Sequence, residues 1–314
     1  IDLPMTSPSP NVDPRIDDLL RQRDRPLLSY EFFPPKSEGA AEKLRQTIQR
    51  LSSTSPDFVT VTYGAGGSTQ EKTFEIAGDL RAQNFKPVMP HLTCVGKTRE
   101  ELKDVAEMIY DNGFRNIMTL RGDPPKGQEH FVPADGGLSC ARDLVHLLKE
   151  CHQEFCLGVA GYPEGHLESK GPRAELEYLK SKVDAGASFI TTQLFLENDS
   201  FYRFRDQCDA AGIRIPILPG LMPAMSTGQI QRIAAMCGAS LPPDLLNRLA
   251  KAGDNKEAGT EVGILWCTEQ ILDLLRNGVP GIHLYILNQV QPALSYQLAR
   301  SFLDQSQPPS ALTS

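Results

Sequence analysis

The chain has 314 residues, 40% of them hydrophobic, which is enough to bury a large core in one or two domains. Its formal net charge of -7 argues against a nucleic-acid partner or an anionic membrane surface, because both require clustered Lys and Arg. The seven cysteines are an odd number without a C-x-x-C pair, which favours reduced thiols in a cytoplasmic protein over disulfides or a zinc site.

Both ends of the chain are polar. Residues 1–12 are rich in Pro, Ser and Asp and lack the apolar run of a signal peptide, so we expect a flexible lead. Residues 304–314 are expected to form a flexible tail. No stretch between them is long and apolar enough to span a membrane. Residues 13–303 are therefore predicted to form the folded domain.

The folded region alternates between extended and helical patterns. Asp13 and Pro14 are typical of the cap and first turn of a short helix, which is placed to close one end of a barrel. The first strand begins at Leu27 and is stopped by Pro34 and Pro35, which have no N–H to donate. Period-two or β-branched runs predict further strands at Phe58–Tyr63, Val88–Val95, Asn116–Arg121, Cys156–Tyr162, Phe189–Phe195, Pro216–Met222 and Gly281–Asn288.

Helices are predicted between these strands. Two of them open with capping boxes, Ser68 to Glu71 and Thr98 to Glu101. The full set is Ala40–Leu51, Ser68–Gln83, Thr98–Tyr110, Cys140–Glu150, Ala174–Ala185, Asp199–Ala211, Thr227–Met236, Pro243–Ala250, Ala258–Asn277 and Pro292–Phe302. Eight strands alternating with helices predict an α/β fold, a (β/α)8 TIM-type barrel with an extra N-terminal helix. Doubly wound sheets also alternate, so the strand count decides between the two.

Barrels of this kind build their sites at the carboxyl ends of the strands. No strand end offers a lysine for Schiff-base chemistry, and His91 and Asp123 lack a third metal ligand, so no metal site is expected. Glu31 is expected beside an apolar wall of Phe32 and Phe33, although a strand-end acid that faces water is the simpler interpretation of this segment alone. The strand ends together offer a general acid, a second carboxylate and polar groups, which suits a planar redox cofactor: Glu31, Thr62, His91, Arg121, Asp123, Tyr162, Gln193, Pro223 and Asn288.

Seven motifs in order along the chain resemble the methylenetetrahydrofolate reductase family. They are Tyr-Glu-Phe-Phe-Pro-Pro-Lys at 30–36, Thr-Tyr-Gly-Ala-Gly-Gly-Ser at 62–68, His-Leu-Thr-Cys at 91–94, Leu-Arg-Gly-Asp-Pro-Pro at 120–125, Gly-Tyr-Pro-Glu-Gly-His at 161–166, Thr-Gln-Leu-Phe at 192–195 and Leu-Tyr-Ile-Leu-Asn at 284–288. The resemblance extends from about Leu27 to Phe302.

The resemblance implies a barrel with non-covalent FAD that reduces 5,10-methylenetetrahydrofolate to 5-methyltetrahydrofolate with NAD(P)H in ping-pong fashion. Glu31 matches the general acid of the family, and Asp123 matches a second acid near flavin and pterin. The cofactor contacts it implies are Thr62, His91, Arg121, Gly122, Asp123, Tyr162, Glu175, Tyr178 and Lys182. Without the resemblance, His91 would be a satisfied core histidine and Lys182 a solvated helix lysine.

Several positions depart from the pattern of the family. Asp and Asn are expected where this chain has Glu175 and Tyr178, Phe where it has Ile233, and Arg where it has Gln289. These changes leave the choice between NADH and NADPH and the grip on the glutamate tail of folate open. The substrate contacts implied by the resemblance are Gln193, Phe195, Gln229, Ile233 and Gln289.

Two other functions stay open at this stage. A related flavin-dependent barrel such as proline dehydrogenase would need an amino-acid site, and the sequence has no matching cluster. A folate- or flavin-binding protein without turnover is less favoured, because Glu31 and Asp123 are both retained. The expected partners are the small molecules folate and a nicotinamide nucleotide, with a homo-oligomer left open. Because the chain ends soon after the barrel, we expect no regulatory domain of the eukaryotic kind.

Overall fold

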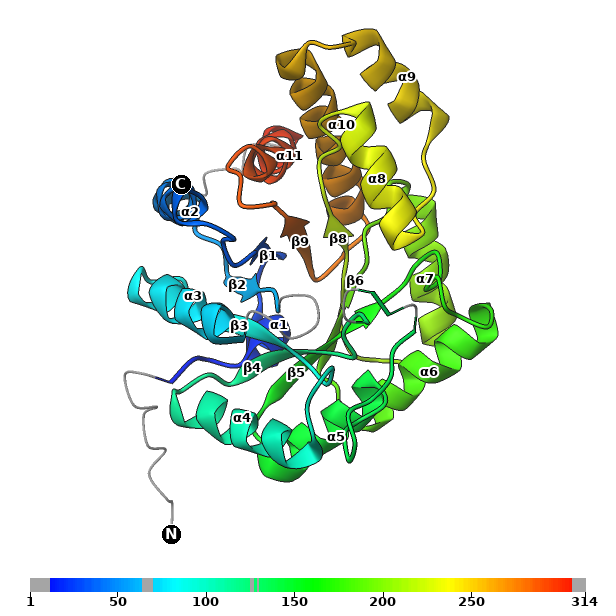
Figure 1. The fold of residues 1–314 in the computed structure, drawn as a ribbon. Helices are drawn as coiled ribbons and strands as arrows, with labels where there is room; N and C mark the ends of the chain where they lie inside the picture. The colour runs from blue at the N-terminus through cyan, green and yellow to red at the C-terminus, as the bar shows by residue number, and fades with distance from the viewer. Residues whose placement is uncertain (1–11, 64–69, 125–126, 129, 307–314) are drawn as a thin grey trace, which may run out of the picture.

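The computed structural model describes residues 12–63, 70–124, 127–128 and 130–306. Their strands form one parallel sheet that curves around a central axis, and the helices lie outside it (Figure 1). The strands are β1 (Leu27–Phe32), β2 (Phe58–Val61), β3 (Val88–Thr93), β4 (Asn116–Leu120), β5 (Cys156–Gly161), β6 (Phe189–Thr192), β7 (Ile217–Leu218), β8 (Gly220–Leu221) and β9 (Gly281–Tyr285).

The barrel closes through a broken strand. β7 and β8 are the two halves of the predicted strand at Pro216–Met222, and they are separated by Pro219. β7 pairs with β6 and β8 pairs with β9, so that this one segment joins both edges of the sheet. Proline has no N–H for a ladder, but the Pro219 carbonyl still accepts the His283 N–H at 3.0 Å. The predicted (β/α)8 fold is confirmed.

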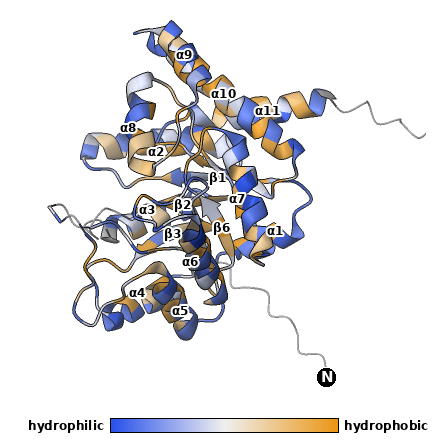
Figure 2. Cartoon of the chain, turned by 90° about the vertical axis from the view of Figure 1, so that its right-hand side faces the viewer, coloured by the Kyte–Doolittle hydropathy of each residue, from blue (hydrophilic) through white to orange (hydrophobic). Residues whose placement is uncertain are grey.

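Polar and apolar residues are mixed along the helices (Figure 2). In the helix at Arg99–Asp111, the buried residues Leu102, Val105, Ala106 and Ile109 follow the spacing of one helical face, and the capping box of Thr98 and Glu101 is confirmed. The capping box at Ser68 involves residues outside the described part. The helices are α1 (Ile16–Gln22), α2 (Glu38–Leu51), α3 (Gln70–Ala82), α4 (Arg99–Asp111), α5 (Ala141–Cys151), α6 (Pro172–Asp184), α7 (Asn198–Ala210), α8 (Thr227–Cys237), α9 (Pro243–Ala252), α10 (Lys256–Arg276) and α11 (Pro292–Ser306), with a 3-10 turn at Ser52–Thr54.

The short helix α1 closes the amino-terminal end of the barrel, as predicted. Its residues Ile16 and Leu20 pack in one cluster with Phe58, Met89 and Phe189, which point inward from the beginnings of three strands. The predicted cap was wrong. Arg15 precedes the helix, whereas Asp13 is buried and pairs with Arg81 at 3.1 Å while accepting the Val88 N–H.

The ends of the chain differ in part from expectation. α11 continues to Ser306, and an ion pair between Arg300 and Asp304 at 3.5 Å lies within its last turns. Residues 304–306 are therefore helical, so the predicted start of the tail was wrong. The predicted lead up to residue 11 and the tail from 307 lie outside the described residues. In the described part of the chain, no helix combines the length and apolarity needed to cross a membrane.

Candidate active site

The barrel interior is polar near the carboxyl ends of the strands and apolar at the opposite end, which α1 closes. Alternation along β1 turns Ser29 and Glu31 inward, and the same alternation along β9 turns His283 and Tyr285 inward. Register pairs Ser29 with His283 and Glu31 with Tyr285 across the two strands. β3 adds His91 to this layer. These five side chains meet near the carboxyl ends of their strands, where the sequence predicted a site.

Glu31 lies at the centre of this polar layer and is only 8% exposed. Its Oε2 atom lies 3.5 Å from His91 Nε2 and 3.7 Å from His283 Nε2. Burial lowers the pKa of His91 to about 4, with the Glu31 charge opposing that shift, so His91 is neutral near pH 7. The other ring nitrogen of His283, Nδ1, lies 2.8 Å from Ser29 Oγ. The carboxyl group thus lies between two imidazoles.

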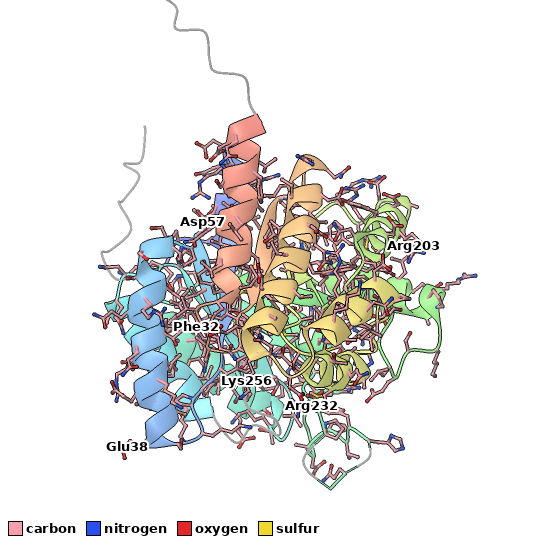
Figure 3. All side chains as sticks on the ribbon, turned by 90° about the horizontal axis from the view of Figure 1, so that it is seen from above. Phe32, Glu38, Asp57, Arg203, Arg232 and Lys256 are labelled. Atoms are coloured by element: carbon pink, nitrogen blue, oxygen red, sulfur yellow. The ribbon has the colours of Figure 1, made fainter. Side chains whose placement is uncertain are left out.

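Phe32 does not form the expected apolar wall beside Glu31. Phe32 points to the opposite face of β1, is fully buried, and packs edge-on against Phe85 at 6.2 Å between ring centroids. Phe32 belongs to the apolar layer between the sheet and the helices. Figure 3 shows it inside the molecule, with Glu38 and Arg203 labelled at the edge for comparison. The reason is the period of two along a strand, which places neighbouring residues on opposite faces. The predicted wall was therefore wrong for Phe32.

A cavity of about 280 Å³ lies beside this layer, at the ends of β4 and β5 and against α5 and α6. Five of the predicted cofactor residues line it together: Arg121, Tyr162, Glu175, Tyr178 and Lys182. They come from segments up to sixty residues apart in the sequence, and the barrel brings them together. Lys170 and Cys140 also line it.

Lys182 is the most unusual group in this cavity, because it is a lysine that is only 3% exposed. Its Nζ donates to the Ala160 carbonyl at 2.6 Å and lies 5.0 Å from the centre of the Tyr178 ring. Burial lowers its pKa to about 8, and the charge of Glu175 partly offsets that shift. None of the ion pairs among the described residues includes it. A buried ammonium group without a carboxylate is suited to bind an anionic ligand.

Tyr178 connects the two helices of the cavity. Its hydroxyl oxygen accepts the Ala141 N–H at 3.1 Å, at the beginning of α5, and its ring covers Lys182. Tyr178, Lys182 and Glu175 lie on the same side of α6, as their spacing predicted. The hydroxyl thus satisfies one of the free amides of the α5 terminus.

Arg121 and its neighbours form the upper rim of the cavity. The Arg121 guanidinium pairs with Glu168 at 2.6 Å. Gly122 has a φ of +91°, and a Cβ atom there would lie 2.9 Å from Thr93 Cβ, so the position requires glycine. Asp123 is exposed to solvent, close enough to Arg121 and Tyr162 for its charge to act on both.

The remaining predicted residues lie around the barrel mouth. Thr62 follows β2 and donates its N–H to the Phe32 carbonyl. Gln193 is half-buried after β6, and its Oε1 accepts the Leu194 N–H at 2.8 Å. Gln229 and Ile233 lie on α8, where Gln229 accepts the Met225 N–H and Ile233 packs against an apolar cluster. Gln289 is exposed.

Phe195 does not belong to the site. It is fully buried, and its ring stacks on Phe201 of α7 at 5.6 Å between centroids. It therefore contributes to the layer between sheet and helices, and the expected substrate contact was wrong. It lies two positions after Gln193, but the strand has already ended at Thr192, so strand alternation does not carry over to Phe195.

Sequence reasoning missed Ser29, His283 and Tyr285. Tyr285 donates its hydroxyl to the Thr192 carbonyl at 2.6 Å across the barrel, and burial together with the Glu31 charge raises its pKa. Reading only the last residue of each strand overlooked them. The period-two alternation of Gly281–Tyr285 was the available signal, because it places His283 on the same face as Tyr285.

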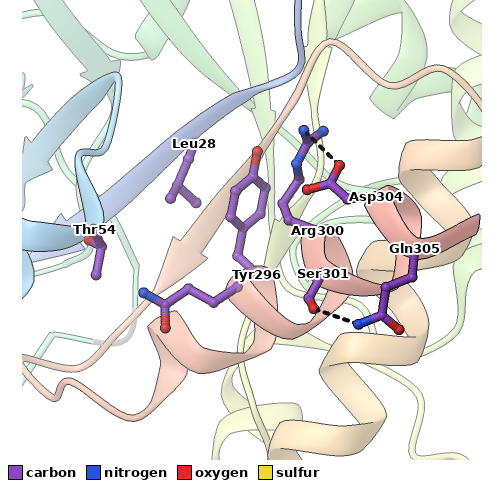
Figure 4. Close-up of a pocket in the computed structure, with 8 residues that line it drawn as sticks. Leu28, Thr54, Tyr296, Arg300, Ser301, Asp304 and Gln305 are labelled. Carbon is purple, nitrogen blue, oxygen red and sulfur yellow. Dashed lines mark hydrogen bonds and ion pairs between the residues drawn. The ribbon is translucent and has the colours of Figure 1, made fainter. Parts of the chain in front are cut away.

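A second hollow of about 600 Å³ lies elsewhere on the molecule (Figure 4). It is bordered by Leu28 near the beginning of β1 and by Tyr296, Arg300 and Asp304 of α11. It contains none of the predicted site residues and lies away from the carboxyl ends of the strands. Within the described residues, no three His, Cys, Asp or Glu side chains are grouped as metal ligands would be.

Comparison with known proteins places this site in a family. The family model of methylenetetrahydrofolate reductase matches residues 15–297. The chain is 39% identical over 295 residues to methylenetetrahydrofolate reductase (NADH) 1 of Arabidopsis thaliana, covering 91% of this chain and 50% of that protein. It is 37% identical over 277 residues to 5,10-methylenetetrahydrofolate reductase of Escherichia coli, covering 87% of this chain and 90% of that protein.

The chain thus spans about half the length of the plant relatives that it matches. Among solved structures, an uncharacterized protein from Clostridium thermocellum that binds two copies of 5-methyl-5,6,7,8-tetrahydrofolic acid has a TM-score of 0.60 and 18% identity, covering 91% of this chain and 98% of that one. That likeness concerns the fold. The matched region contains the strands of the barrel and all of the predicted site residues, and the chain belongs to the methylenetetrahydrofolate reductase family.

Proposed function

We propose that this protein reduces 5,10-methylenetetrahydrofolate to 5-methyltetrahydrofolate with NAD(P)H, using non-covalent FAD and admitting its two substrates in turn. The observation that carries the proposal is the buried carboxyl of Glu31 between His91 and His283, beside a cavity with a buried lysine. Membership of the family supports it, and the NADH named for plant relatives favours NADH as the reductant.

The residues of the cavity fit FAD. Lys182 offers a buried cation for a pyrophosphate. Gly122 packs closely against Thr93 and has no side chain, so no side chain of its own obstructs its backbone. The chemistry that a bound FAD supplies is the transfer of a hydride from NAD(P)H to the methylene carbon of the folate. Arg121, Tyr162, Glu175, Tyr178 and Lys182 would hold it.

Glu31 would act as the general acid. Opening the five-membered ring of the folate requires a proton at a ring nitrogen, and a carboxyl group can deliver it when held within hydrogen-bond reach. The imidazoles of His91 and His283 flank that carboxyl. Asp123 carries a negative charge at the mouth, which would favour a cationic iminium of the folate. Gln193 would hydrogen-bond the pterin.

The decisive experiment follows the flavin absorbance of the purified protein anaerobically. Addition of NADH or NADPH should bleach it, and addition of methylenetetrahydrofolate should restore it. Glu31→Gln should bind flavin and be bleached normally but lose the recovery. Glu38→Gln, an exposed glutamate at the beginning of α2, is the matched control and should behave as the wild type.

The other outcomes identify the alternatives. Bleaching without recovery in the wild type would favour another flavin-dependent barrel dehydrogenase, and flavin binding without bleaching a non-catalytic binder. Failure to bind flavin would contradict both enzyme hypotheses. We also propose that the protein acts in the cytoplasm, where thiols stay reduced. All seven of its cysteines are free.

A further inference from the structure

The end of β1 is held by a side chain rather than by a strand. Phe33 N–H donates to Asn288 Oδ1 at 2.9 Å, and Asn288 Nδ2 donates to the Phe33 carbonyl at 2.8 Å. The N–H and the carbonyl both belong to the backbone of Phe33, two residues after Glu31. The carboxamide therefore acts as a substitute peptide group that accepts and donates at once.

The substitution occurs where the β1–β9 ladder ends. The ladder begins with Leu27 N–H bonding the Pro280 carbonyl, and its paired residues end at Glu31 and Tyr285. By the two-residue period of a parallel ladder, Phe33 N–H would next meet the Ile286 carbonyl. That carbonyl instead accepts the Gln289 N–H at 2.9 Å. Asn288 thus replaces the missing partner.

The turn that returns Asn288 to β1 is strained. Leu287 has a φ of +50° and Asn288 a φ of +56°, both in the left-handed region. Asparagine tolerates this region, but leucine rarely adopts it. Such strain persists where surrounding contacts enforce it, and it is frequent at functional sites. Here the contacts are the two bonds to Phe33 and a third from Thr47 Oγ1 to the Asn288 carbonyl at 3.1 Å.

We propose that Asn288 is a positioning residue for the general acid: it anchors the end of β1 so that the Glu31 carboxyl stays between His91 and His283. Pro34 and Pro35 follow and have no N–H, so Phe33 is the last amide of this segment that can be anchored. Beyond the last paired residues, Glu31 and Tyr285, the Asn288 side chain connects the end of β1 to the segment that follows β9. The inference rests on the proposed function, because positioning matters only if Glu31 delivers a proton.

The test compares three variants. Asn288→Gly keeps the left-handed backbone available and removes the carboxamide; Asn288→Asp keeps an acceptor for Phe33 N–H; Thr47→Val removes the third bond only. Amide hydrogen exchange is followed in a peptide over residues 30–36, where the prolines leave few amides. The two flavin half-reactions are measured separately on the flavin-loaded protein.

Asn288→Gly should speed exchange of the Phe33 amide about tenfold and slow the folate half-reaction about tenfold, with flavin binding and reduction by NADH unchanged. Asn288→Asp should retain amide protection, and Thr47→Val should match the wild type. Wild-type exchange in Asn288→Gly, or fast exchange with a normal folate half-reaction, would overturn the inference. If the wild type itself fails to reoxidise with folate, the proposed function fails, while the exchange result still reports on the anchor.

Discussion

Glu31 and His283 face each other across the seam of β1 and β9, with 3.7 Å between Glu31 Oε2 and His283 Nε2. The far nitrogen of the same ring meets Ser29 Oγ at 2.8 Å. All three side chains belong to paired strands of the barrel, so their spacing is set by the sheet and not by a loop. Side chains held on strands in this way are well suited to precise proton transfer.

Replacing His283 by Phe should slow the folate half-reaction by about tenfold to a hundredfold, because the carboxyl of Glu31 loses a polar partner that orients it. Reduction of the flavin by NADH should be unchanged. Stopped-flow absorbance measures both steps and should show slowing of the folate step only. His146→Asn is the control, since that histidine side chain is 64% exposed on α5. Equal slowing of both half-reactions would refute a role specific to the acid.

Asp123→Asn should raise the flavin reduction potential, because it removes a negative charge from the mouth of the site. Asp123 is exposed, so the effect is screened: an interaction of about 1 kcal/mol in water corresponds to about 20 mV for a two-electron couple. Folate reduction should also slow. Spectroelectrochemical titration measures the potential. An unchanged potential would show that Asp123 does not act through its charge.

The order of strands and helices could be predicted because it depends on local patterns. The eight predicted strands all occur, and the capping box at Thr98 marks the beginning of α4 as expected. The sequence contains Pro219, at which the strand breaks. Only the pairing of β7 with β6 and of β8 with β9 shows that the barrel still closes. The cap prediction failed because Asp13 is buried and pairs with Arg81 of the distant helix α3.

The site was predictable only in part. The resemblance led to Arg121, Tyr162 and Lys182, which share one cavity. It could not show that Lys182 would be buried, because burial depends on how α5 and α6 pack. His283 was overlooked, since its importance follows from strand register across a separation of 254 residues from Ser29. Phe195 was misplaced because the strand ends three residues before it.

Leu20→Ala should destabilise the protein by about 2–5 kcal/mol, because it leaves a cavity in the plug formed by α1 at the base of the barrel. Chemical denaturation followed by circular dichroism measures the change. Leu167→Ala is the matched control: that side chain is 65% exposed, and its loss should change stability by less than about 0.5 kcal/mol. Because the plug lies at the opposite end from Glu31, both half-reactions should keep their rates. A loss of stability no larger than that of the control would contradict the plug.

Lys182 predicts a pH dependence of cofactor binding. Burial lowers its pKa from 10.5 to about 8, against the opposing charge of Glu175. In the apoprotein, the unfolded state therefore binds more protons than the folded state between about pH 8 and 10.5, and Lys182 lowers stability by about 3 kcal/mol at pH 7. This cost disappears as the pH rises through that window. A bound anion would raise the pKa again, so binding should take up a proton.

The dissociation constant of FAD should accordingly be constant below about pH 7.5 and rise by up to about tenfold per pH unit above pH 8, where the apoprotein lysine loses its charge. Quenching of flavin fluorescence by apoprotein measures it. Lys182→Met should bind FAD more weakly at pH 7 and lose this dependence, and its apoprotein should be more stable than the wild type at pH 7. Lys180→Met is the matched control, because Lys180 lies on the same helix and pairs with Asp184 at the surface. If Lys182→Met keeps the slope above pH 8, another group near the cavity controls the proton uptake.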